Sequence, residues 1–164
     1  MTLAGGLQEA KRTETSAVNE AARHGQAFTQ SFVDKSQLMP APIRPEWVLE
    51  GDPKAMCAVL ARHKFGWGDA CHWSCTAGKF RWHYGWDESV MFLEGGVRIT
   101  DEAGHVYEGK PGVTLFFPAG TSAVWEVPTY IRKLAFNQKP VPWYLHYQSR
   151  ILERLKGVGK KLFG

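Results

Sequence analysis

The sequence predicts a single all-β domain built as a small barrel. The chain has 164 residues, a length that suits one domain with a buried core. Short apolar runs recur from about residue 46 to residue 138, and glycines and prolines separate them. Aromatic residues make up 13% of the chain, with seven tryptophans, as is usual in small barrels that large side chains fill.

Residues 1–45 are predicted to form an N-terminal arm and a proline-rich linker. Residues 1–36 are polar and rich in alanine, so their apolar stripe is too thin for a core helix. We expect a helical or loosely ordered arm there, which is either a frayed terminus or a dimer contact or lid. Pro40, Pro42 and Pro45 then predict a stiff, extended connector.

The barrel itself is predicted over residues 46–140. Residues 55–61 have the pattern of a short buried strand. The next strand places Cys71, Trp73 and Cys75 on one face, because alternate residues of a strand share a face. Cys71 and Cys75 would lie about 13 Å apart along that strand, which is too far for them to share a zinc ion.

Residues 78–95 form the central predicted hairpin. Polar and aromatic residues alternate in its first strand, as is typical of a half-buried strand, in the order Lys79, Phe80, Arg81, Trp82 and His83. Its second strand, residues 90–93, is apolar and ends at glycines. We expect the turn between them to bring His83 and Glu88 close together at the mouth of the hairpin, where they would act on a metal or a proton.

The remaining strands are predicted at short intervals. A turn-forming tetrapeptide at residues 101–104 separates two strands that should pair as a hairpin. Pro118 and Gly120 form a second turn between β-rich runs, and Pro140 ends the last strand. These predicted strands cover residues 96–100, 105–107, 113–117, 123–127 and 131–136.

Residues 141–164 are predicted to form a basic amphipathic helix. Apolar residues recur there at helical spacing, at Ile151, Leu155, Val158 and Leu162. Residues 150–164 hold five Lys or Arg and one Glu, and so account for the whole formal net charge of +4. We expect this helix to pack on the barrel or across a dimer, and contact with an anionic membrane surface is the alternative.

Composition disfavours several functional classes. Because the net positive charge is confined to the C-terminal residues, no basic face for nucleic acid is expected. The chain has no apolar run that would serve as a signal peptide or membrane span. Three cysteines do not make a disulfide framework. We therefore expect a reduced, cytoplasmic protein.

The central hairpin resembles the first motif of the cupin superfamily. That motif has a glycine, five residues, His-x-His, three or four residues, a glutamate, six residues and a glycine. Glu88 and Gly95 keep its last interval, and His83 takes the position of the second histidine when four residues precede the glutamate.

A later stretch resembles the second cupin motif. Gly112, Pro118 and Gly120 match its glycine, five residues and Pro-x-Gly. The resemblance covers roughly residues 46–138, and the wording of residues 73–82 is similar to that of (S)-ureidoglycine aminohydrolase-like cupins. It implies one double-stranded β-helix (an RmlC-like jelly-roll barrel) that pairs as a homodimer.

The resemblance also implies a metal site, from which this chain departs. A metal-binding cupin would have histidines at positions 81 and 123, where this chain has Arg81 and Ala123. With His83 and Glu88 retained, a divalent Mn, Fe, Zn or Ni ion would have two of its four usual protein ligands. A guanidinium cannot coordinate a metal, and Arg81 would instead suit a bound carboxylate.

Two functions follow from this pattern, and whether the protein is an enzyme stays open. The first is a metal-dependent, hydrolase-like enzyme in which His83 and Glu88 hold a metal or transfer protons while Arg81 binds the substrate. The second is a metal-free cupin that binds a small polar or anionic metabolite in a regulatory role. In both, aromatic residues should line the pocket, namely Trp82, Tyr84, Trp86 and Trp125.

Overall fold

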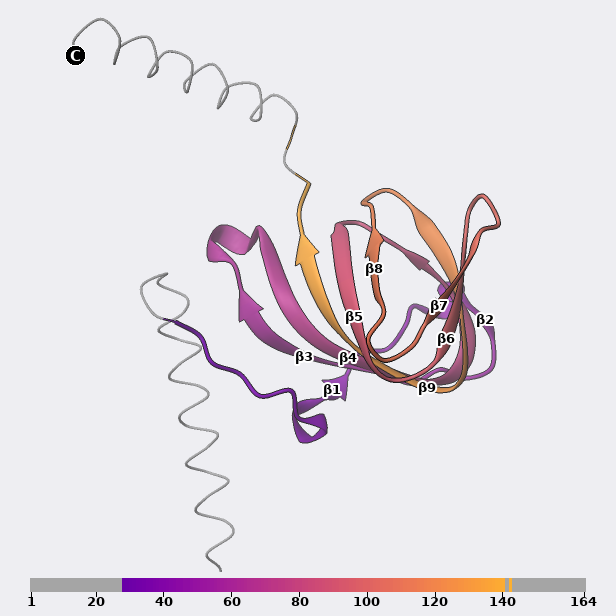
Figure 1. Ribbon diagram of the computed structural model, residues 1–164, viewed down its shortest axis with the longest axis horizontal. Helices are drawn as coiled ribbons and strands as arrows, with labels where there is room; N and C mark the ends of the chain where they lie inside the picture. Colours follow the sequence, from indigo (N-terminus) through magenta and orange to yellow (C-terminus); the bar gives the residue numbers. More distant parts are fainter. Residues whose placement is uncertain (1–27, 141, 143–164) are drawn as a thin grey trace, which may run out of the picture.

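The computed structural model describes residues 28–140 and residue 142 (Figure 1). These residues form nine β-strands and three short 3-10 turns, with no α-helix among them. The predicted all-β class is therefore confirmed for this part of the chain. The C-terminal helix predicted over residues 141–164, apart from residue 142, lies outside the described residues, as do residues 1–27. In the described ranges no helix has the length and apolar character needed to cross a membrane.

Most of the strands are joined by short connections. The chain begins with η1 (Lys35–Gln37), β1 (Met39–Pro40), η2 (Pro45–Trp47), β2 (Val48–Glu50), β3 (Ala55–Arg62) and η3 (Lys64–Gly66). It continues with β4 (Gly68–His83), β5 (Asp87–Gly95), β6 (Val97–Asp101), β7 (Val106–Gly109), β8 (Thr114–Phe117) and β9 (Ser122–Gln138).

The two longest strands, β4 and β9, hold the barrel together. They pair antiparallel along their length, from Gly68 opposite Gln138 to His83 opposite Ser122. The first half of β4 pairs with β3 and its second half with β2, whereas β9 pairs first with β6 and then with β5. Both strands therefore bend through the two halves of the barrel (Figure 1). The sequence predicts each of them as two shorter strands, and this division is wrong.

A β-bulge in β4 decides which of its side chains face the core. The register with β9 shifts between Thr76 and Gly78. Before the bulge the odd-numbered residues, such as Trp73, face the core, and after it the even-numbered residues, such as Phe80, do so. Glycine is required at the bulge because a Cβ at Gly78 would lie 2.8 Å from the Pro53 ring.

Aromatic rings fill the centre of the barrel. Trp125 and Phe80 are each 1% exposed, and their rings stack with centroids 6.0 Å apart. Trp73 and Phe117 also contact the Trp125 ring, at 6.0 and 5.8 Å. Offset and edge-on pairs at these separations add to the stability that burial supplies. The centre of the barrel is therefore a packed core.

Part of the predicted N-terminal arm packs on the barrel. β1 pairs with β3, and Leu38 and Ile43 are buried. Lys35 of η1 forms an ion pair with Glu94 of β5 at 2.8 Å. Burial of two apolar side chains shows that the folded domain begins before residue 46.

Candidate functional site

A buried ion pair between β5 and β9 is the centre of the candidate site. Glu88 shares the inward-facing parity of Val90, and Lys133 shares that of Ile131. The Lys133 Nζ donates to Glu88 Oε1 at 2.5 Å, and the two side chains are only 7% and 8% exposed. Each charge thus neutralises the other at a place that water barely reaches.

Two tryptophan rings flank the ammonium group. Lys133 Nζ lies 5.0 Å from the ring centroid of Trp73 and 4.6 Å from that of Trp125. The faces of these rings attract a cation electrostatically, and the attraction is stronger where water is excluded. Lys133 is therefore a fixed positive charge inside the barrel, held by one carboxylate and two rings.

Polar side chains of β3, β4 and β9 extend the ion pair along the inner face. Asn137 lies opposite Glu88 in register and donates to Asp69 Oδ1 at 2.7 Å. The Cys71 thiol donates to the same oxygen at 3.3 Å, and Cys57 packs beside this group from β3. Cys57, Asp69 and Asn137 are partly exposed. A hydrogen-bonded cluster that reaches solvent therefore lies beside the ion pair.

Tyr84 lies on the other side of Glu88. Its ring stacks on Phe117 with centroids 4.5 Å apart, and its hydroxyl accepts a hydrogen bond from Trp125 Nε1 at 2.9 Å. Burial raises the pKa of Tyr84, and the negative charge of Glu88 raises it further. Tyr84 therefore stays neutral and structural at physiological pH.

A pocket of about 380 Å³ lies at one end of the barrel, between the β6–β7 hairpin, β8 and the start of β9. Its buried floor includes Tyr84, Phe117 and Ala123. Two carboxylates, Asp101 and Glu102, belong to its lining, and no described lysine or arginine does. The walls are mainly apolar or aromatic, and include Ile99, Tyr107, Leu115, Phe116 and Pro118.

Hydrogen bonds position both carboxylates of this pocket. Asp101 accepts from the backbone and ring of His105, at 2.9 and 3.1 Å, and from the Tyr107 hydroxyl at 3.2 Å. Desolvation opposes ionisation, but the hydrogen bonds outweigh it and lower the pKa of Asp101. Glu102 Oε1 accepts from Ser122 Oγ at 2.7 Å. The pocket therefore presents negative charge at neutral pH.

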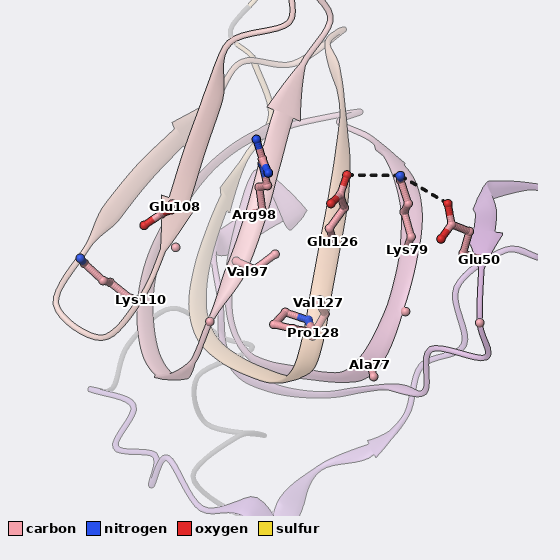
Figure 2. Close-up of a pocket in the computed structure, with 14 residues that line it drawn as sticks. Glu50, Ala77, Lys79, Val97, Arg98, Glu108, Lys110, Glu126, Val127 and Pro128 are labelled. Atoms are coloured by element: carbon pink, nitrogen blue, oxygen red, sulfur yellow. Dashed lines mark ion pairs between the residues drawn. The ribbon is translucent and has the colours of Figure 1, made fainter.

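A larger groove of about 740 Å³ lies on the outer face of the sheet (Figure 2). Its charges alternate from strand to strand, because Lys79 pairs with Glu50 at 3.4 Å and with Glu126 at 3.3 Å. Arg98 lies beside Glu126 in register, and Glu108 lies beside Arg98. Exposed pairs of this kind contribute at most about 1 kcal/mol each. We interpret this row as surface stabilisation.

The structure places Arg81 and His83 apart from Glu88, although the first cupin motif grouped these three residues. Arg81 and His83 are exposed, because they alternate with inward-facing residues such as Phe80. The His83 ring packs against Trp47, with centroids 5.1 Å apart. Glu88 lies inside the barrel, and no contact between His83 and Glu88 is found among the described residues. His83 and Glu88 therefore do not form the predicted pair, and Arg81 does not lie beside such a pair.

Three of the four aromatic residues predicted to line a pocket lie inside the barrel. Trp82 and Trp125 belong to the packed aromatic interior, and Tyr84 lines the pocket of about 380 Å³. Trp86 follows β4 and instead has the Lys139 ammonium 5.0 Å from its ring centroid. Sequence reasoning missed Lys133, although it shares the strand parity of the apolar Ile131 and Ala135 in β9.

The inward positions of the first motif are Trp82 and Tyr84. The motif allows three or four residues before its glutamate, and with three the histidine positions fall on these two residues instead of on Arg81 and His83. The structure favours this second register, since both aromatic side chains point toward the interior that contains Glu88.

These positions do not fit a divalent metal. Trp82 and Ala123 offer no ligand, burial keeps Tyr84 neutral, and Glu88 is already bound to the Lys133 ammonium. A positive charge at this carboxylate would also repel a metal cation. Among the described residues, no group of three or more His, Cys, Asp or Glu side chains is arranged to hold a metal ion.

Comparisons with known proteins agree with this barrel. Residues 64–135 match the family described as the EutQ-like cupin domain. A DUF861-family protein of unknown function from Pseudomonas syringae is 21% identical with a TM-score of 0.57, over 62% of this chain and 44% of that one. The Clostridium difficile EutQ protein is 18% identical with a TM-score of 0.47, over 52% of this chain and 63% of that one.

A DUF861-family protein from Thermotoga maritima is 33% identical over 39% of this chain and 73% of that one, with a TM-score of 0.38. The chain thus spans less than half of the Pseudomonas protein and less than two thirds of the Clostridium protein. No curated protein matches the chain. The finer resemblance to ureidoglycine aminohydrolase-like cupins stays a prediction. The sequence motifs, the all-β barrel and the domain match together support the cupin superfamily, with residues 64–135 as a EutQ-like cupin domain.

Proposed function

We propose that this protein is a metal-independent cupin that binds a small organic molecule in the pocket of about 380 Å³. One observation carries the proposal, namely the chemistry at the four positions of a cupin metal site. Three of them hold Trp82, Tyr84 and Ala123, and Lys133 neutralises the fourth, Glu88. The lysine ammonium places a positive charge inside the barrel. Unlike a bound metal ion, it has no open coordination position for a ligand.

The pocket has the size and lining of a small-molecule site. Ligand pockets commonly enclose about 300–1,000 Å³ and combine apolar walls with a few polar groups. Here Phe116 is 60% exposed on the pocket wall, and hydroxyl and carboxylate groups such as those of Ser122 and Glu102 are available for hydrogen bonds. An exposed aromatic ring beside fixed polar groups is a surface that a ligand would cover.

The charge of the pocket indicates the class of ligand. Asp101 and Glu102 favour a neutral or cationic polar group, and the rings of Tyr107 and Phe116 favour an apolar body or an organic cation. An anionic metabolite was expected because of Arg81, but that residue is exposed on the outer face and does not line the pocket. We therefore favour a small amine over a carboxylate.

The alternative, a metal-dependent hydrolase-like enzyme, has less support. It needs His83 and Glu88 at one centre, whereas His83 is exposed and Glu88 is buried. Neither Glu88 nor Lys133 lines the pocket. Homodimer formation and a cytoplasmic location stay predictions beside this proposal.

Binding of two matched probes would test the proposed function. Benzylamine and benzoate have the same ring and opposite charges, and both are small enough for the pocket. In isothermal titration calorimetry with excess EDTA, we expect benzylamine to bind more tightly than benzoate. Glu102→Gln and Phe116→Ala should each weaken benzylamine binding several-fold. Glu108→Gln, which changes a carboxylate of the outer groove, is the matched control and should have no effect.

Three results would contradict the proposal. One is binding that requires added Mn, Fe, Zn or Ni and disappears in EDTA, because the pocket is then part of a metal site. A second is preferential binding of benzoate that Arg81→Ala abolishes, because the ligand would then be an anion held on the outer face. The third is an equal loss of benzylamine binding in Glu108→Gln and Glu102→Gln, because the ligand would then not bind in the pocket.

A further inference from the structure

We propose that Cys57 and Cys71 form a dithiol that peroxide oxidises to an intramolecular disulfide. Both residues are free cysteines on adjacent antiparallel strands, β3 and β4. Cys57 lies opposite Trp73, and Cys71 lies opposite Val59, so the two cysteines are diagonal neighbours. Both face the barrel interior, where the two side chains interact.

The surroundings give the two thiols different roles. Cys57 is partly exposed, whereas Cys71 is only 8% exposed. Interaction with the Cys71 thiol lowers the pKa of Cys57, and the ammonium of Lys133 acts in the same direction, against burial and the Asp69 carboxylate. The interaction with Cys57, together with burial, raises the pKa of Cys71. Cys57 is therefore the accessible nucleophile, and Cys71 is the resolving thiol.

The oxidation proceeds in two balanced steps. The Cys57 thiolate attacks one oxygen of hydrogen peroxide, an S–O bond forms, the O–O bond breaks, and the leaving hydroxide takes a proton to become water. The Cys71 sulfur then attacks the Cys57 sulfenic acid, an S–S bond forms, the S–O bond breaks, and a second water leaves. Overall, two thiols and one peroxide give one disulfide and two waters.

Neighbouring groups assist the second step. The Cys71 thiol already donates to Asp69 Oδ1 at 3.3 Å, so this carboxylate can take the thiol proton and pass it to the leaving hydroxide as the disulfide forms. Diagonal cross-strand cysteines start slightly too far apart for a relaxed disulfide. β3 can shift to close this gap, because its register with β4 is irregular between Val59 and Ala61 and its other partner, β1, has only two residues.

Cys75 provides a control within the same strand. It is 0% exposed, and burial raises its pKa to about 12. Such a thiol is shielded from peroxide and is scarcely ionised at neutral pH. Cys75→Ser should therefore leave the reaction unchanged, whereas Cys57→Ser and Cys71→Ser should each abolish disulfide formation.

The test uses the full chain, reduced and then treated with a few equivalents of hydrogen peroxide at neutral pH. After catalase treatment and unfolding, a chromogenic reagent counts the free thiols, and mass spectrometry of the alkylated protein locates them. We expect the count to fall from three to one per chain, with Cys75 as the free thiol, and dithiothreitol should restore all three. In Cys71→Ser, a Cys57 sulfenic acid should accumulate and react with dimedone.

Three outcomes would overturn the proposal. These are an unchanged thiol count, a disulfide that joins two chains, and accumulation of Cys57 sulfinic acid in the wild-type protein while Cys71 stays free. The first result would show that Cys57 is unreactive, and the other two that Cys71 does not resolve it. None of these outcomes depends on the identity of the pocket ligand, so this inference and the proposed function fail or hold separately.

Discussion

Replacing Lys133 with methionine should destabilise the protein strongly. Methionine keeps an unbranched apolar side chain but removes the ammonium that neutralises Glu88. Removal of one partner from a buried ion pair typically costs about 3–5 kcal/mol, because the remaining charge is left desolvated. The side chains here are 7% and 8% exposed, so we expect a loss within that range at pH 7.5.

Urea unfolding followed by tryptophan fluorescence would measure this loss. Lys79→Met is the matched control, since Lys79 pairs with two glutamates on the outer face but is 33% exposed. It should cost far less than Lys133→Met. The double variant Lys133→Met/Glu88→Gln should recover much of the loss, because no buried charge is then unpaired. The interpretation fails if Lys133→Met costs no more than Lys79→Met, or if the effects in the double variant simply add.

Three further predictions follow from the structure. Stability should fall as the pH drops from 7.5 to 5.5, because burial and then the charge of Arg132 lower the pKa of His72 below 6.5. The unfolded chain then gains a proton that the folded chain does not. Urea midpoints that are the same at both pH values in the wild type, or that fall equally in His72→Gln, would contradict this. Gly95→Ala should lower the thermal unfolding temperature more than Gly112→Ala. Both glycines have positive φ. A Cβ at Gly95 would lie 1.9 Å from the Tyr130 carbonyl oxygen, whereas one at Gly112 meets nothing within 4 Å. Arg81→Ala should change stability by less than about 0.5 kcal/mol, as expected for an exposed residue, and a larger loss would show that Arg81 is part of the core.

Sequence patterns predicted the fold well because the barrel depends on alternation and turns. The runs predicted at residues 55–61 and 113–117 correspond to β3 and β8, and the hairpin around residues 101–104 corresponds to β6 and β7. The lengths of β4 and β9 could not be predicted in the same way. A strand that continues through a bulge at Gly78 or past Pro128 has the same local signals as two strands joined by a turn.

The candidate site was predicted less well, for a reason that lies in strand parity. The alternation of Phe80 and Trp82 with Arg81 and His83 already indicated which face is buried, but the motif was aligned so that the polar residues faced inward. One residue of register exchanges the two faces of a strand. Lys133 gave no motif signal, because only the folded barrel shows that β9 carries it to Glu88 of β5.

Metal analysis of the purified, untagged protein tests the central claim most directly. The protein would be incubated with Mn, Fe, Zn or Ni, freed of excess ion and examined by elemental analysis beside Glu88→Ala and Lys133→Met. The account predicts much less than one metal ion per chain in the wild type, because Lys133 occupies the carboxylate that a metal would need. Near-stoichiometric metal in the wild type that Glu88→Ala removes would contradict it.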